Sequence, residues 1–295
     1  MNEYLEIFLT AYRDYSSYLI SSLKNPFPEG DINYFYFLIV VSLAVWGLEL
    51  AFPWRKKQKA FRKDFWLDAF YMFFNFFIFN LLLYIALSEV TIKLITDILS
   101  PIGYQGGHLL DLSYLHWGWQ LFIFFVISDF VQWSVHVLLH RVPFLWKIHK
   151  VHHSVKEMGF AAHLRYHFGE TLVYNSFKYI SLSMIFGFHL ELAFIIHGLA
   201  ITIGHLNHAN VGWDYGPLKF ILNNPKMHIW HHSKQLPSDR PYGMNYGITL
   251  SIWDYLFRTD YIPYDGRDIE LGFDKDERYN TNFFRQLIEP FRDKE

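Results

Sequence analysis

The sequence contains no cysteine, which excludes disulfide bonds, thiolate-bound metals, iron–sulfur clusters and a catalytic thiol. Charged residues are also scarce, at 18% of the chain against roughly 25% in soluble domains. The 26 basic and 28 acidic residues nearly cancel, so no overall field favours a nucleic acid as a partner. The GxSxG, P-loop and HExxH motifs are missing too, which leaves serine hydrolases, nucleotide-driven transporters and metalloproteases without support.

Apolar residues are abundant instead: 52% of the chain is hydrophobic and 20% is aromatic. We interpret three runs of about 20 apolar residues as transmembrane helices, because each can cross ~30 Å of hydrocarbon: Tyr34–Phe52, Phe65–Leu87 and Trp117–Leu139. A further apolar stretch, Thr171–Leu206, is interrupted by Gly187, His189 and Glu191, which favours two short helices folded back as a hairpin. The first residues, MNEYLE, are acidic where a signal peptide has a basic region, so no cleaved leader is expected.

The loop between the first two predicted helices is strongly basic. It contains Arg55, Lys56, Lys57, Lys59, Arg62 and Lys63. By the positive-inside rule this loop is cytoplasmic, and residues Ser88 to His116 then form a loop on the far side. The third helix returns to the cytoplasm at its C-terminal end, so the histidines that follow are expected to face the cytoplasm.

From about Asp214 onward the chain is rich in Pro, Gly, Asn and charged residues, which predicts short segments forming a cap beside the membrane. We expect a disordered end after about Thr281. The predicted fold class is all-α, a multi-pass membrane helical bundle with a cytoplasmic, His-rich di-metal cap. Its parts form one integrated domain: N-terminal membrane helices with connecting loops (1–115), the His-rich region (116–260) and a C-terminal tail (261–295).

The histidines carry the argument for metal binding. All but two of the 16 lie between His136 and His232. Three sets have spacings that place their rings on one helical face: His136 and His140; His149, His152 and His153; and His228, His231 and His232. Each set can direct its rings at one point, as the two histidines of a zinc helix do. Eight rings exceed the needs of one tetrahedral site, so we expect two metal ions, with His208 as a natural ninth ligand and His205 as a weaker one.

Other histidines have less certain roles. His163 and His167 are four residues apart, and each can be a ligand or can orient a ligand by a hydrogen bond. His189 and His197 fall in the apolar hairpin, where we expect polar groups satisfied between helices. His108 and His116 lie on the far side of the predicted membrane and are set aside.

Four polar side chains are candidates for orienting the ligands. Asp129 lies two helical turns before His136 on the same face, and we hypothesise that it accepts the second ring N–H of a ligand, assisted by Gln132. The alternative is a polar contact that packs two helices together. Glu170 and Asp254 are similar candidates.

From about Asp129 to Asp260 the sequence resembles the fatty acid hydroxylase / sterol desaturase superfamily of integral-membrane, His-rich di-iron proteins. The resemblance rests on the segments SDF, HVLLH, PFLWKIHKVHHS, AAHLRYHFGE, GHLNHANVGWDYGPL, NPKMHIWHHS and MNYGITLSIWDYLFRT. It implies that two iron ions are bound by His136, His140, His149, His152, His153, His208, His228, His231 and His232. Asn210 and Asn245 match positions that the family commonly fills with Asn. Val137, the HFGE segment and Arg258 depart from the usual pattern and blur the subfamily.

The resemblance implies an oxidoreductase that uses two iron ions, with O2 as co-substrate, to hydroxylate or desaturate a membrane lipid: a sterol, a fatty-acyl or a related apolar chain. Electrons would come from a separate donor of the cytochrome or ferredoxin/reductase type, because no flavin or nicotinamide fingerprint is present. Three alternatives remain open: an ether-lipid monooxygenase of the alkylglycerol type, a membrane haem protein with two His ligands, and a metal carrier without catalysis.

Overall fold

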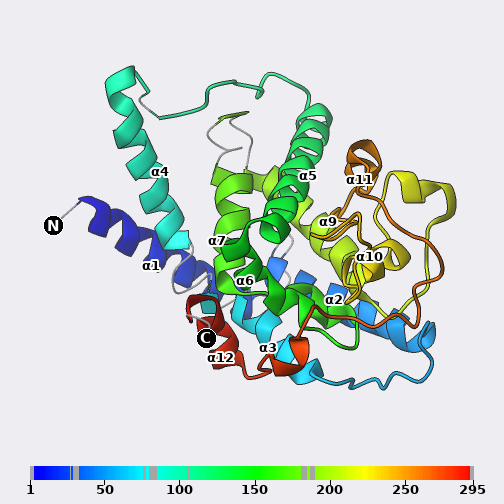
Figure 1. Ribbon diagram of the computed structural model, residues 1–295. Coiled ribbons are helices and arrows are strands. Elements are labelled where there is room, and N and C mark those ends of the chain that lie inside the picture. Colours follow the sequence, from blue (N-terminus) through cyan, green and yellow to red (C-terminus); the bar gives the residue numbers. More distant parts are fainter. Residues whose placement is uncertain are drawn as a thin grey trace.

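The computed structural model describes residues 3–26, 28, 33–75, 78–79, 85–104, 106–180, 185–186 and 190–292. Within these ranges the regular elements are helices, and β-structure is limited to two isolated bridges, Leu222–Leu250 and Ser233–Leu271. The predicted all-α class is therefore confirmed for the part of the chain that the structure describes. The helices that carry the histidines gather near the end of one long helix, α5 (Figure 1).

Two helices among the described residues are long and apolar enough to cross a membrane, α2 (Tyr34–Ala51) and α5 (Trp117–Arg141). They coincide with the first and third predicted runs. In α2, Val40 is 63% exposed and Leu43 is 57% exposed, and Phe122 of α5 is 56% exposed. Leaving such surface in water costs about 25 cal/mol per Å², so these faces are suited to lipid rather than to solvent.

The start of α5 and its passage into α6 follow from local sequence. His116 caps α5, because its Nδ1 accepts the N–H of Gly118 at 3.2 Å. Val142 is extended, as a residue before proline tends to be, and Pro143 occupies the first turn of α6 (Pro143–His153). The chain thus turns sharply between two sets of histidines, one at the end of α5 and one on α6.

The N-terminal part contains helices that the sequence analysis did not predict. Helix α1 (Glu3–Lys24) packs along α4 (Ile85–Leu99), and α4 stands where a loop was expected from Ser88 onward. That prediction was wrong for residues 88–99. The second predicted run begins as α3 (Phe65–Phe73), while residues 76–77 and 80–84 of that run lie outside the described residues.

The predicted hairpin corresponds to two helical stretches. Helix α7 (Phe168–Asn175) continues into a π-helical segment, η4 (Ser176–Ile180), and α9 (Leu190–His208) follows. The interrupting residues Gly187 and His189 lie outside the described residues. Helix α9 contacts both α5 and α10 (Pro225–His231), so it closes one side of the His-rich region.

The C-terminal region consists of short segments, among them α11 (Ile252–Phe257) and α12 (Phe283–Ile288). The expected disordered end after Thr281 was wrong for residues up to 292. Phe283 of α12 is buried against Tyr71 and Phe74, and Gln286 accepts the hydroxyl of Tyr71 at 2.8 Å. This packing attaches the end of the chain to α3.

Candidate metal centre

Nine buried histidines converge from α5, α6, α9 and α10 into two clusters. In each cluster one ring nitrogen per residue lies within 4.8 Å of the others. The five-His cluster consists of His136, His140, His149, His153 and His231, and the four-His cluster consists of His152, His208, His228 and His232. These are the nine residues singled out in the sequence, so the structure brings that whole set together.

The two HxxHH motifs are shared between the clusters in opposite ways. On α6, the outer pair His149 and His153 enters the five-His cluster and His152 enters the four-His cluster. At α10 the outer pair, His228 and His232, enters the four-His cluster, and the central ring, that of His231, enters the five-His cluster. Two of the three rings of each motif therefore share a cluster, while the third ring turns to the other cluster. Each of α6 and α10 therefore contributes rings to both sites.

Burial keeps these rings in the form that binds metals. All nine side chains are at most 8% exposed. Burial lowers the pKa of His231 to about 4, and together with the charges of neighbouring rings it lowers the pKa values of His152, His153 and His228 well below the ordinary range. At neutral pH the rings are uncharged and their lone pairs are available to a cation.

Hydrogen bonds fix which nitrogen faces inward. In five of the rings Nδ1 donates to a backbone carbonyl, and the pairs are His136 with Tyr246, His140 with Tyr242, His152 with Arg165, His208 with Gly204 and His231 with Met244. A carbonyl oxygen can only accept, so each of these rings carries its proton on Nδ1. Each then presents the Nε2 lone pair to the interior of its cluster.

The donor sets fit metal ions. His152 Nε2 and His208 Nε2 lie 3.2 Å apart, yet both rings hold their proton on Nδ1, so neither nitrogen can donate to the other. His140 Nε2 and His231 Nε2 are buried without any hydrogen-bond partner. Nitrogens bound to one metal at about 2.1 Å would lie about 3 Å apart at right angles, close to the separations seen here. Facing lone pairs without a donor are what a bound cation would satisfy.

A short segment between α10 and α11 supplies three of the orienting carbonyls. Tyr242, Met244 and Tyr246 present their oxygens to His140, His231 and His136. Asn245 adopts a left-handed conformation (φ 55°), and its amide group binds Met227 and Tyr261. Asn245 therefore shapes this segment and contacts no ligand ring. The sequence analysis missed these carbonyls, because backbone oxygens leave no signature in side-chain identity.

The carboxylate candidates separate into three roles. Glu170 Oε2 lies 3.0 Å from His149 Nδ1 and thereby orients that ring, and burial raises the pKa of its carboxyl well above the ordinary value. Asp254 accepts from Trp133 and from the N–H groups of Tyr246 and Gly247, so it acts on His136 only through the backbone of residue 246. Asp129 contacts no histidine in the described contacts, and the hypothesis that it orients a ligand directly is not supported.

Asp129 instead fastens the α11 region to α5. Its Oδ2 accepts the indole N–H of Trp253 at 2.9 Å and the N–H of Leu250 at 3.3 Å. We therefore expect Asp129→Asn, which keeps an acceptor oxygen, to retain the full metal content of the protein. Mass spectrometry of metals in the purified variant tests this. Loss of one metal per chain would show that Asp129 controls a ligand after all.

The remaining candidates lie around the clusters rather than in them. His163 and His205 contact each other through Nδ1 atoms 2.8 Å apart beside the four-His cluster, and His205 also contacts Ser42. His167 caps α7 and bonds the carbonyl of Leu287. Three further side chains make other contacts: Asn210 binds the backbone of Arg55, Gln132 accepts from Lys178, and His197 packs on Tyr34.

The part of the chain that carries the two His clusters matches a known protein family in sequence. Residues 121–259 match the family model of the fatty acid hydroxylases. This match covers slightly less than half of the chain, and within it the chain is similar to the fatty acid hydroxylases, in line with the superfamily that its sequence resembles.

Among curated proteins, the chain is similar to an ornithine lipid hydroxylase of Rhizobium tropici, with 34% identity over 172 residues that cover 58% of this chain and 50% of that protein. It is also similar to the alkylglycerol monooxygenase of Xenopus tropicalis, with 30% identity covering 49% of this chain and 31% of the relative. A human fatty acid hydroxylase domain-containing protein is 28% identical over 55% of this chain and 46% of its own length. The chain thus spans half or less of each of these relatives. No solved structure matches it.

Proposed function

We propose that the chain is an O2-dependent di-iron hydroxylase or desaturase that acts on a membrane lipid. The observation that carries the proposal is the pair of buried His clusters whose Nε2 lone pairs face one another without donors. The fatty acid hydroxylase match and the two lipid-oxidising relatives support the same class. Bound iron would supply the activation of O2.

The protein's own residues would prepare the site in two ways. The five carbonyls and Glu170 hold the rings in one tautomer and one orientation before metal arrives. The burial of all nine histidines excludes bulk water, which would otherwise compete with an apolar substrate and quench reactive oxygen species. For hydroxylation, one C–H bond becomes C–OH, and the second oxygen atom of O2 leaves as water with two electrons and two protons from a donor system.

We further propose a multi-pass membrane arrangement with the clusters on the cytoplasmic side. Basic residues support this orientation, since Lys56, Lys57 and Lys59 are exposed in the loop that follows α2. Exposed apolar side chains on α9, including Phe194 and Leu199, support substrate entry sideways from the bilayer. A separate electron donor of the cytochrome or ferredoxin/reductase type would dock on the cytoplasmic side.

The first test is metal content. Protein purified in detergent from iron-replete cells is expected to contain about two irons per chain, and His152→Ala and His231→Ala are each expected to contain less. The second variant removes a ring from the five-His cluster and the first removes one from the four-His cluster. One metal or none in the native protein, unchanged by either substitution, would overturn the di-metal proposal.

The reaction is tested by incubating the native protein with membrane lipids, a chemical reductant and isotopically heavy O2. A lipid that gains one heavy oxygen atom supports hydroxylation, and loss of two hydrogens without oxygen indicates desaturation. Release of an aldehyde would favour a second candidate, ether-lipid cleavage, which the likeness to alkylglycerol monooxygenases supports. Exchangeable metal without O2 consumption would indicate a carrier and overturn the oxygenase proposal.

A further inference from the structure

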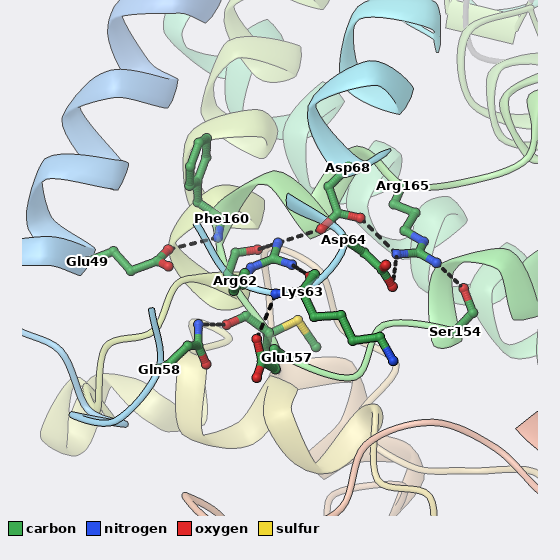
Figure 2. Close-up of polar contacts among 12 residues, drawn as sticks. Glu49, Gln58, Arg62, Lys63, Asp64, Asp68, Ser154, Glu157, Phe160 and Arg165 are labelled. Atoms are coloured by element: carbon green, nitrogen blue, oxygen red, sulfur yellow. Dashed lines mark hydrogen bonds and ion pairs between the residues drawn. The ribbon is translucent and has the colours of Figure 1, made fainter. Parts of the chain in front are cut away.

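A buried network of charged groups joins the loop between α2 and α3 to the chain that follows α6 (Figure 2). Arg62 pairs with Asp68 at 2.6 Å, and the other oxygen of Asp68 pairs with Arg165 at 3.1 Å. Arg165 also donates to the hydroxyl of Ser154 at 2.8 Å. The network therefore begins in the basic loop, whose charges indicate membrane orientation in the sequence. It ends at Ser154, the residue after His153.

The network is unusually well shielded from solvent. The side chains of Arg165 and Asp68 are 0% exposed, and that of Arg62 is 2% exposed. Burying ion pairs is costly, and apolar residues of similar size often give equal or greater stability. Stability alone is thus a weak reason for burying two guanidinium groups here. A stronger reason is that the buried ion pairs orient a nearby group.

The group that the network orients is His152. The carbonyl oxygen of Arg165 accepts the Nδ1–H of His152 at 3.2 Å. The side chain of the same residue is held by Asp68, by Ser154 and, at 3.5 Å, by Asp64. Fixing the side chain of Arg165 at these points fixes its backbone, and with it the direction in which His152 presents Nε2 to the four-His cluster.

The connection between α6 and η3 (Phe160–Leu164) is held by the same loop and by the end of α2. Arg55 and Gln58 of the loop both donate to the carbonyl of Met158. Glu49 of α2 accepts the N–H of Phe160 (Figure 2). The chain passes so close to Arg62 that a Cβ on Gly159 would overlap its guanidinium. This segment, which ends at Arg165, therefore has little freedom to move.

We propose that Arg62, Asp68 and Arg165 form a positioning device that sets the metal affinity of the four-His cluster by holding His152 in place. This inference rests on the proposed metal function of the clusters. None of the three side chains contacts a histidine ring in the described contacts, so they act through the backbone of residue 165 and are positioning residues. Among the described contacts the carbonyl of Arg165 binds no ring of the five-His cluster, so we expect the device to act mainly on the four-His cluster.

The test is Asp68→Asn, which removes the charge that both arginines share while keeping the shape of the side chain. Loss of a partner that orients a ligand typically weakens metal binding by about 10- to 100-fold. We expect dialysis against a mild chelator to leave about one metal per chain in the variant and about two in the native protein. Adding His228→Ala, in the four-His cluster, is expected to cause no further loss, whereas adding His140→Ala is expected to remove the remaining metal.

Asp276→Asn is the matched control. The Asp276 side chain is also 0% exposed and pairs with Lys156 and Lys234, but no hydrogen bond links it to a ligand ring. Asp276→Asn is expected to lower thermal stability while both metals are retained.

Equal metal loss in the two variants, or two tightly held metals in Asp68→Asn, would overturn the inference. If Asp68→Asn does not accumulate, Ser154→Ala removes one hydrogen bond to Arg165 without removing a charged group, and it is expected to weaken metal binding in the four-His cluster selectively. Unchanged affinity there would also overturn the inference. Absence of metal from the native protein would instead mean that the proposed function has failed.

Discussion

Replacing Glu170 by Gln is expected to weaken metal binding in the five-His cluster by about 10- to 100-fold, with a parallel loss of lipid oxidation. Glu170 is the only carboxylate among the described residues that contacts a ring of either cluster, through the 3.0 Å contact with His149 Nδ1. The amide of Gln can still occupy the space, but it cannot ionise, so it cannot supply the negative charge that a carboxylate would place behind the His149 ring when a cation is bound. Chelator titration followed by metal analysis measures the change.

Asp129→Asn serves as the control for Glu170→Gln, since both carboxylates are 4% exposed and only one of them faces a histidine. Metal affinity is expected to fall in the Glu170 variant alone. If both variants retain metal equally well, the hydrogen bond between Glu170 and His149 does not contribute to the site. If both variants lose metal, the cause is a general destabilisation of the fold.

Replacing Asp254 by Ala is expected to lower the free energy of unfolding by about 4 kcal/mol or more, at least about 1 kcal/mol for each of four donors. This fully buried carboxylate accepts from the indole of Trp133, the hydroxyl of Thr259 and the N–H groups of Tyr246 and Gly247. Each buried donor left without a partner costs about 1–3 kcal/mol. Chemical denaturation of the detergent-solubilised, metal-free protein measures the difference.

Two further variants define the cause of that loss. Asp254→Asn keeps one acceptor oxygen and is expected to be destabilised less than Asp254→Ala. Asp274→Ala changes an exposed carboxylate, 88% exposed at its side chain, and is expected to have a small effect. A small effect of Asp254→Ala would contradict the role assigned to it. Since Tyr246 orients His136, the Ala variant is also expected to bind metal less tightly in the five-His cluster.

The histidines themselves were predictable, because spacings of three and four residues place rings on one face of a helix whatever surrounds it. Their division between two clusters was not. Whether His152 joins His149 or turns toward His208 depends on how α6 crosses α9 and α10, which is a property of tertiary packing. Local periodicity therefore identified the ligand set but could not assign each ligand to a site.

Two of the missed helices, α4 and α12, show different limits of the sequence. Helix α4 has 15 residues and contains Glu89, Lys93 and Asp97, so it offers no uninterrupted apolar run of the length that predicts a membrane helix. Helix α12 is six residues long, and its order depends on the burial of Phe283 against α3, a contact distant in sequence. Short helices of this kind depend on tertiary contacts more than on local propensity.

The basic loop between α2 and α3 shows a similar limit. A count of lysines and arginines treats its residues as equivalent, but Arg62 is buried in an ion pair while Lys57 and Lys59 are exposed. The sign of a charge can be read from the sequence. Its partner, Asp68 for Arg62, becomes visible only when the loop is folded onto α3.

The reciprocal use of the two HxxHH motifs has a consequence for biosynthesis. Both clusters need rings from α10, so neither donor set is complete until residues 228–232 have left the ribosome. By then α5 and α6 have already been made, and their histidines still lack the rings from the α10 segment that complete each set. The four-His cluster takes two of its rings from this segment, so metal loading of that cluster is a late event that depends on correct packing of the whole region.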